Sequence, residues 1–192
     1  MRARVREDLQ DTDSQNYRWT DDEVDGAIDR VVTEYSLHAP IEQQDDIATT
    51  DGDTELDIAT LTGLLEIESV EFPIGQAPKY LQRTEYWAGH LYMEDEGDGE
   101  DARVRWLKKH TLTAGSTTIP TEHEEIIVLG ATGYLAMSAS TYTVDRASIA
   151  GRHAAINFKA WGKERLSRYD KKLKAIARTN RVVQRAFYTE DD

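Results

Sequence analysis

The 192-residue sequence predicts an α+β fold, in which a helical frame carries an inserted antiparallel β module. Apolar residues recur with a helical period near both ends of the chain, whereas β-branched and aromatic residues between turn signals dominate its middle. We therefore expect a helical domain formed by residues 1–49 and 119–180. The β module is expected at residues 50–118, and residues 181–192 form a C-terminal tail.

The N-terminal helix of this frame is predicted to begin at Thr20. Thr20 and Glu23 have capping-box spacing, and the acidic first turn suits the positive end of the helix dipole. Apolar residues follow at helical spacing: Val24, Ala27, Ile28, Val31, Val32 and Tyr35. Pro40 ends the helix. Before it, residues 2–9 form a charged segment long enough for one or two helical turns.

The middle of the chain changes to the pattern of strands. Residues 64–72, 84–93 and 102–107 are rich in β-branched and aromatic side chains, and glycine- or proline-containing turns separate them. Residues 76–83 fit either a loop or a strand. We expect four or five short strands in a small antiparallel sheet or sandwich. Three aromatic side chains are interpreted as one face of this sheet and not as a ligand site: Trp87, Tyr92 and Trp106.

A second core helix is predicted after Pro120, from a further capping-box pattern at Thr121 and Glu124 to about residue 139. This helix contains Gly130 and Gly133 among alanines and aliphatic residues. Because glycine lowers helix stability, its use here indicates that another helix approaches closely. Packing therefore explains these glycines better than a phosphate-binding loop does.

The last segment is strongly basic. Residues 146–188 hold twelve Lys and Arg against two acidic residues, whereas residues 1–145 hold eleven basic and 31 acidic residues. A long C-terminal helix is predicted to begin between residues 145 and 152 and to reach Arg178, a length of roughly 40–50 Å. Its apolar stripe is loose, so we expect neighbouring subunits to cover part of it.

Three interpretations of this basic helix are open. It binds nucleic acid through its cations, it docks on an acidic protein surface, or it is a solvated helix face. The candidate cations are Arg165, Arg168, Lys171, Lys172, Lys174 and Arg178. The acidic body would repel phosphate, which favours docking to protein. The acid-rich, lysine-poor composition fits a halophilic source and an ordinary acidic protein equally well.

No catalytic constellation is recognisable, and we predict no catalytic residue, no metal site, no cofactor and no enzymatic activity. The five histidines lack the spacing of metal ligands, and the chain has no cysteine. The acidic run at residues 94–101 lacks the spacing of a calcium-binding loop, so a solvated hairpin loop is favoured over a cation site. No apolar stretch is long enough for a membrane span, and no export signal is visible.

Three places in the chain carry a family resemblance. A charged helix at residues 4–9 and a polar loop lead through Tyr-Arg-Trp-Thr, residues 17–20, into the acid-capped helix. The small-residue helix at residues 129–139 follows, and then Phe-Lys-Ala-Trp-Gly-Lys-Glu-Arg-Leu at residues 158–166 leads into the basic stretch. This order resembles the head-to-tail connector (adaptor, or neck) proteins of tailed viruses. The β segment departs from their purely helical members.

The resemblance implies a structural virion protein that forms a ring, expected to be a dodecamer, under the portal. Its partners would be the portal protein and the next neck or tail component, and the ring would line the channel for DNA that passes without sequence specificity. Localisation would be the virion neck, and the host cytoplasm during assembly. C-terminal residues of such adaptors commonly reach the portal, which makes these residues the candidate contacts: Arg178, Arg181, Arg185, Phe187 and Tyr188.

Two other function classes remain as alternatives. One is a DNA-binding or packaging accessory protein that uses the basic C-terminal helix directly. The other is a metal-dependent enzyme built around residues 94–101.

Overall fold

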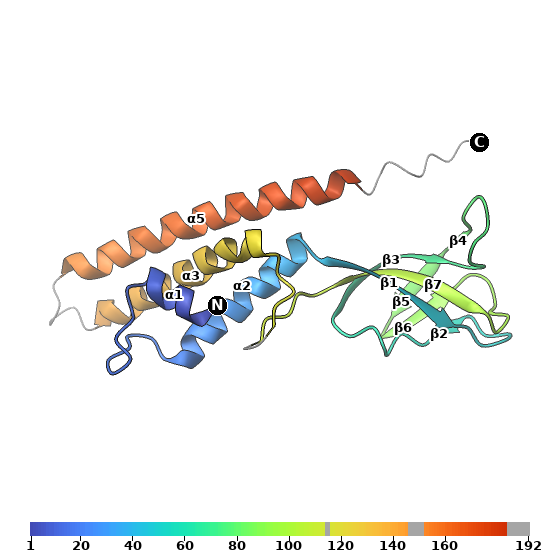
Figure 1. The fold of residues 1–192 in the computed structure, drawn as a ribbon, viewed down its shortest axis with the longest axis horizontal. Coiled ribbons are helices and arrows are strands. Elements are labelled where there is room, and N and C mark those ends of the chain that lie inside the picture. The colour runs from blue at the N-terminus through green and yellow to red at the C-terminus, as the bar shows by residue number, and fades with distance from the viewer. Residues whose placement is uncertain (114–115, 146–151, 184–192) are drawn as a thin grey trace. The chain divides into compact units, whose positions relative to one another are not determined.

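The computed structural model describes residues 1–113, 116–145 and 152–183, with side chains described up to residue 139 and again over residues 158–178. The chain divides into two compact units (Figure 1). The helical unit comprises Met1–Ala39 and His110–Asp192, and the β module comprises Pro40–Lys109. Helices and antiparallel sheets occur together as predicted, and the α+β fold class is confirmed.

The boundaries of the β module differ from the expected residues 50–118. Strand β1 (Ile41–Ala48) pairs along its whole length with β7 (Asp101–Lys108) and belongs to the module. Its central residues are polar and exposed, so the apolar alternation that marks a strand is missing from its sequence. At the other end, residues 110–119 belong to the helical unit, where His110 and Ile119 are buried.

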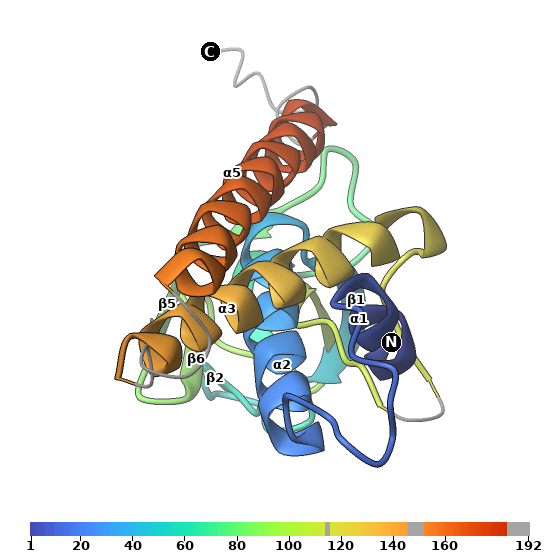
Figure 2. The same cartoon turned by 90° about the vertical axis from the view of Figure 1, so that its left-hand side faces the viewer.

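The helical unit contains four α-helices in the described part of the chain. These are α1 (Arg2–Asp8), α2 (Asp21–His38), α3 (Glu124–Asp145) and α5 (Arg152–Val183). Helix α3 packs against α1, α2 and α5, and Figure 2 shows it passing between α2 and α5. The helical unit therefore has its core around α3. No helix in the described residues combines the length and the apolar composition that crossing a bilayer requires.

The two predicted capping boxes have different outcomes. At α2 the box is present: the Glu23 N–H donates to Thr20 Oγ1 (3.2 Å), and the Thr20 N–H donates to the Glu23 carboxylate (2.7 Å). The box predicted at Thr121 is wrong. Residues Thr121–His123 form a 3₁₀ turn without a side-chain cap, and Pro120 takes the position that precedes a helix. Thr121 lies inside the turn, one position too late for a cap.

The close helix approach predicted from the glycines of α3 is confirmed. A Cβ atom built on Gly130 would lie 2.9 Å from the Val31 side chain, and one built on Gly133 would lie 2.9 Å from Leu166. Helix α5 contributes Gly162, where a Cβ would lie 3.1 Å from the Ala136 side chain. The contacts between α3 and the neighbouring helices α2 and α5 thus depend on glycine, which has no side chain to separate the helices.

The β module consists of two antiparallel sheets, with strand orders β1-β7-β3-β4 and β2-β6-β5. The remaining strands are β2 (Glu55–Leu56), β3 (Leu64–Glu71), β4 (Leu81–Gln82), β5 (Thr84–Trp87) and β6 (His90–Met93). Residues from both sheets share one apolar core: Leu56, Ile58, Leu61, Val70, Phe72, Leu91, Met93, Ala102, Val104 and Trp106. The segment 76–83 is mainly loop, with the short strand β4 near its end.

The sequence predicts that Trp87, Tyr92 and Trp106 share one face of a sheet, and this prediction is wrong for Trp106. Trp106 lies in the other sheet, where it is buried and its indole N–H donates to the Asp45 carboxylate at 2.7 Å. Trp87 and Tyr92 lie in adjacent strands of the β2-β6-β5 sheet. Sequence order cannot separate the two sheets, because strands from both alternate along the chain.

We predict that Gly133→Ala lowers the free energy of unfolding by about 1–3 kcal/mol, because the new methyl group meets Leu166 in a packed interface. Gly26→Ala in the exposed part of α2 is the matched control. It meets no atom within 4 Å and should stabilise the chain by about 0.5–1 kcal/mol through helix propensity alone. Urea unfolding of both variants measures the difference, and equal effects of the two substitutions would contradict tight packing at Gly133.

Candidate interaction surfaces

The N-terminal stretch that carries the family resemblance is held together by a buried arginine. We call Arg6 and its partners Asp11, Trp19 and Asp21 the N-terminal clamp. The Arg6 guanidinium is buried and donates to the Asp11 carboxylate (2.7 Å), to the Trp19 carbonyl (3.0 Å) and to the Asp21 carboxylate (2.6 Å). It also lies 3.6 Å from the centre of the Tyr17 ring. A buried charge requires such partners, and here they join α1, the polar loop and the first residue of α2. The sequence does not reveal Arg6, because it is one of several arginines in a charged segment.

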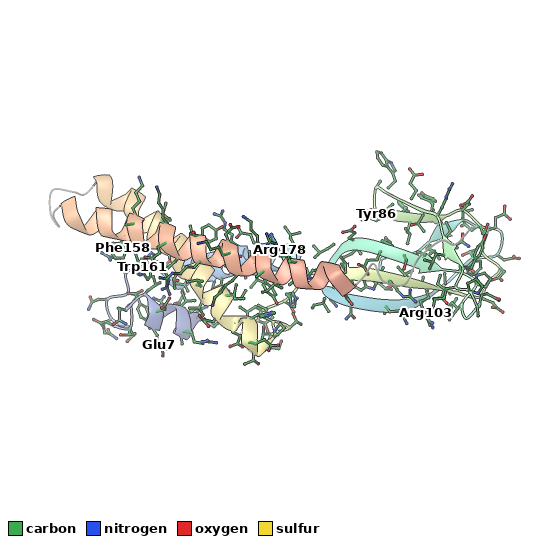
Figure 3. The ribbon with its side chains drawn as sticks, turned by 90° about the horizontal axis from the view of Figure 1, so that it is seen from above. Glu7, Tyr86, Arg103, Phe158, Trp161 and Arg178 are labelled. Atoms are coloured by element: carbon green, nitrogen blue, oxygen red, sulfur yellow. The ribbon has the colours of Figure 1, made fainter. Side chains whose placement is uncertain are left out.

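The same motif contacts Phe158, the first residue of α5 whose side chain is described. Trp19 is buried, and its ring meets the Phe158 ring edge-on with centroids 6.3 Å apart. The Arg18 guanidinium lies 4.6 Å from the centre of the Phe158 ring. Figure 3 labels Phe158 and Trp161 towards one end of α5 and Arg178 towards the other. The clamp therefore attaches the early part of the long helix to the N-terminal region.

Part of the apolar stripe of α5 packs inside its own chain. Tyr169 and Leu173 are buried in the helical core, and Phe158, Leu166 and Ile176 pack against it. Of the other stripe residues, Trp161 is half-buried outside this core, and the side chain of Ile156 lies outside the described residues. Cover by neighbouring subunits stays a prediction.

Four of the six cations proposed for nucleic-acid binding already have partners within the chain. Arg165 pairs with Asp8 and donates from Nε to the Thr132 hydroxyl (2.8 Å), and burial lowers its pKa. The other three pairs are Arg168 with Glu164, Lys172 with Glu125, and Lys174 with Asp170. These three pairs are exposed, and such pairs are weak enough to exchange for a partner.

The other two candidates, Lys171 and Arg178, lie on the solvent side of α5 together with Lys159 and Lys163. Lys159, Lys163, Lys171 and Arg178 are exposed, and no ion pair is formed by them among the described residues. From Lys159 to Arg178 they extend over about 28 Å of helix at 1.5 Å per residue. We call these four residues the cationic face of α5. It is suited to contact an acidic surface over several turns.

Of the five predicted contact residues, Arg178 is described with its side chain, which is exposed on α5. The backbone of Arg181 belongs to the last turn of the same helix, but its side chain lies outside the described residues. Arg185, Phe187 and Tyr188 lie outside the described residues entirely. Their role as partner contacts stays a prediction.

Within the helical unit, His110 connects the end of α2 to the segment that leads into α3. Its backbone N–H donates to Ser36 Oγ (3.0 Å), and its Nε2 lies 2.8 Å from the Ala39 carbonyl oxygen. Nδ1 lies 3.0 Å from the Thr118 carbonyl oxygen and 3.1 Å from the Thr118 hydroxyl. Both ring nitrogens therefore have hydrogen-bond partners. Burial lowers the pKa of His110, although the contacts with the Ala39 and Thr118 carbonyls oppose this shift.

A second buried ring adjoins this histidine. The Tyr35 hydroxyl lies 2.6 Å from Nδ1 of His123, and the rings of Tyr35 and His110 have centroids 5.0 Å apart. Burial raises the pKa of Tyr35 to about 12. These titratable groups therefore serve packing and hydrogen bonding at the base of α2.

The acidic run at residues 94–101 is folded against a neighbouring turn. The Gly97 N–H donates to the Asp53 carbonyl (2.8 Å), and a Cβ on Gly97 would lie 2.6 Å from the Thr49 side chain. The Asp95 carboxylate accepts from the Gln82 amide (2.8 Å). No group of three acidic, histidine or cysteine side chains in the described residues is arranged to hold a metal ion. The carboxylates of this loop are exposed, as expected of a solvated loop. The predicted hairpin is wrong, because the loop connects β6 to β7 and these strands lie in different sheets.

The β module carries most of the net negative charge of the chain. Residues 40–109 hold 17 acidic and six basic residues, a balance of −11 out of the total of −13. The same module exposes large aromatic side chains: Tyr80 is 54% exposed, Tyr86 55% and Trp87 71%. A surface that is both acidic and aromatic is a candidate for binding cations.

We predict that lowering the pH from 7.5 to 5.5 destabilises the chain through His110. Its folded-state pKa is lowered, so the unfolded chain binds more protons below about pH 6.5 and the free energy of unfolding falls as the pH falls. The contribution is at most about 1.4 kcal/mol over this range, the limit for one histidine that gains its proton only in the unfolded chain. Denaturant unfolding of wild type and His110→Gln at both pH values measures it. The variant should lose less stability, and an equal loss would assign the pH dependence to other groups.

Comparison with known proteins shows that the sequence matches no protein-family model and no curated protein.

Proposed function

We propose that this chain is a structural head-to-tail adaptor of a tailed virus, of the kind that the sequence resembles. It forms a ring under the portal, joins the capsid to the neck or tail, and surrounds the channel through which DNA passes. The proposed location is the virion neck, with assembly in the host cytoplasm. The protein acts by binding other proteins and not by catalysis.

The observation that carries the proposal is the construction of the helical unit. The three stretches of the resemblance pack together there: the N-terminal clamp holds the start of α5, and α3 approaches α2 and α5 through glycines. These three stretches, which are far apart in sequence, thus belong to one packed helical unit. Their packing together supports an adaptor fold, in which they would form one helical domain.

The distribution of charge supports the proposed division of roles. The cationic face of α5 is exposed, which suits contact with an acidic protein surface, whereas most of the net negative charge lies in the β module. DNA in a channel lined by acidic side chains is repelled from the wall, so it moves without binding. The sign of the net charge also opposes a free-standing DNA binder.

Imaging of the purified protein by negative-stain electron microscopy tests the assembly. We predict rings with a central opening, alone or on addition of portal protein. Salt-sensitive binding of duplex DNA by a protein that stays monomeric with portal would contradict the adaptor and favour the DNA-binding alternative.

Truncation after Arg178 tests the predicted role of the C-terminal residues. The core residues of α5, up to Ile176, are retained, so the truncated chain should unfold at nearly the same denaturant concentration as the full chain. We predict that it no longer co-sediments with portal. Substitution of Lys159 by Ala in the full-length chain is the control for loss of positive charge elsewhere on α5. Normal portal binding by the truncated chain would refute the role of the tail.

A further inference from the structure

The outward face of the β2-β6-β5 sheet combines aromatic rings with carboxylates. The strand register places Glu55 and Glu85 directly on either side of Tyr92, and Trp87 opposite His90. Residues opposite each other in antiparallel strands share a face, and alternate residues of one strand share it too. All five side chains therefore lie on one face of this sheet. We call it the aromatic–acidic face.

The opposite face of the same sheet is the module core. Leu56 and Leu91 are opposite each other and nearly inaccessible, and Met93 is buried beside them. The aromatic–acidic face consequently points away from the core of its own module. Trp87 is 71% exposed there, the highest value among the exposed large hydrophobic side chains of the described residues. Exposed aromatic clusters on a folded surface mark interaction sites.

Strand β5 is an edge of this sheet. It is hydrogen-bonded to β6 alone in the described part of the module, and its four residues are exposed. The strand carries one charge, Glu85, beside the aromatic side chains of Tyr86 and Trp87. A short edge strand with a charge discourages pairing with other chains. The side chains of β5 are therefore a better site for a partner than its backbone edge.

The charge of the surroundings defines the chemistry of that partner. The module has a balance of −11, and Glu55 and Glu85 lie opposite Tyr92 in the strands on either side of it. Glu55 already contacts His90, which leaves Glu85 as the carboxylate for a partner. The face of an aromatic ring attracts a cation, most strongly for tryptophan, and neighbouring carboxylates add to the attraction. A nucleic acid or a second acidic module would be repelled. Arginine and lysine side chains satisfy both the rings and the carboxylates.

We propose that the aromatic–acidic face binds an arginine- or lysine-bearing segment of another protein. The cation lies over Trp87 or Tyr92 and is paired with Glu85, because Glu55 already contacts His90. This interaction goes beyond the adaptor role, because it rests on residues of the β module alone. Its test does not depend on whether the protein forms a ring or binds the portal.

Fluorescence polarisation with the full-length protein at pH 8 tests the proposal. The probe is a fluorescein-labelled twelve-residue Gly-Ser peptide that contains four arginines, and its counterpart carries citrulline at the same positions. Citrulline keeps the shape of arginine without its charge. We expect the arginine peptide to bind and the citrulline peptide to bind at least tenfold more weakly.

Variants then locate the binding site. Trp87→Ala and Glu85→Gln should each weaken binding about two- to fivefold, and the double variant about tenfold. Both side chains are exposed, so the fold is retained. Tyr80→Ala and Glu42→Gln are matched controls for an exposed aromatic ring and an exposed carboxylate elsewhere on the module, and they should bind like wild type. The indole N–H resonance of Trp87 should shift on titration with the arginine peptide.

Several results would overturn the proposal. Equal weakening by all four variants would mean diffuse attraction to the negative module. Equal binding of the citrulline peptide would show that positive charge is not recognised. No binding of the arginine peptide, together with self-association that Trp87→Ala abolishes, would make the face a contact between copies of this chain.

Discussion

The close approach of α3 to its neighbours is the constraint on which the helical unit depends. Gly130 and Gly133 leave no room for a side chain against α2 and α5, and Gly162 leaves little against α3. This contact determines how α5 is rotated about its axis. Tyr169 and Leu173 consequently face the core, and the cationic face of α5 is directed to solvent. The surface available to a partner is therefore a consequence of interior packing, although none of the three glycines is part of that surface.

Buried polar contacts also hold the segments of the helical unit together, in addition to the close packing at the glycines. Arg6 joins the N-terminal segment to α2, and His110 joins the end of α2 to the approach to α3. Each is a titratable group that burial would penalise without its hydrogen bonds. Their partners include backbone carbonyls, so these contacts define chain path as well as side-chain position. The helical unit thus retains charged and polar groups in places where they orient segments.

Much of this organisation was predictable. The capping box at Thr20 and the helical spacing after it are signals within a few residues of one another, and both are present in the structure. The glycines of α3 predicted close contact correctly. Strand β1 was missed, because its exposed polar residues lack alternation and its identity as a strand comes only from pairing with β7. The second capping box failed because Pro120 already occupied the capping position.

The sequence by itself determined the α+β class, the main helices, and the separation of a basic C-terminal helix from an acidic remainder. These properties depend on neighbours within a few turns or on simple composition. Only the tertiary structure decided which cations stay free, since Arg165 and Lys172 pair with residues more than 40 positions away. It also brought Glu55 beside Tyr92 and Glu85, because strand pairing joins segments that sequence order keeps apart. The cationic face of α5 and the aromatic–acidic face are therefore features that only the tertiary structure decided.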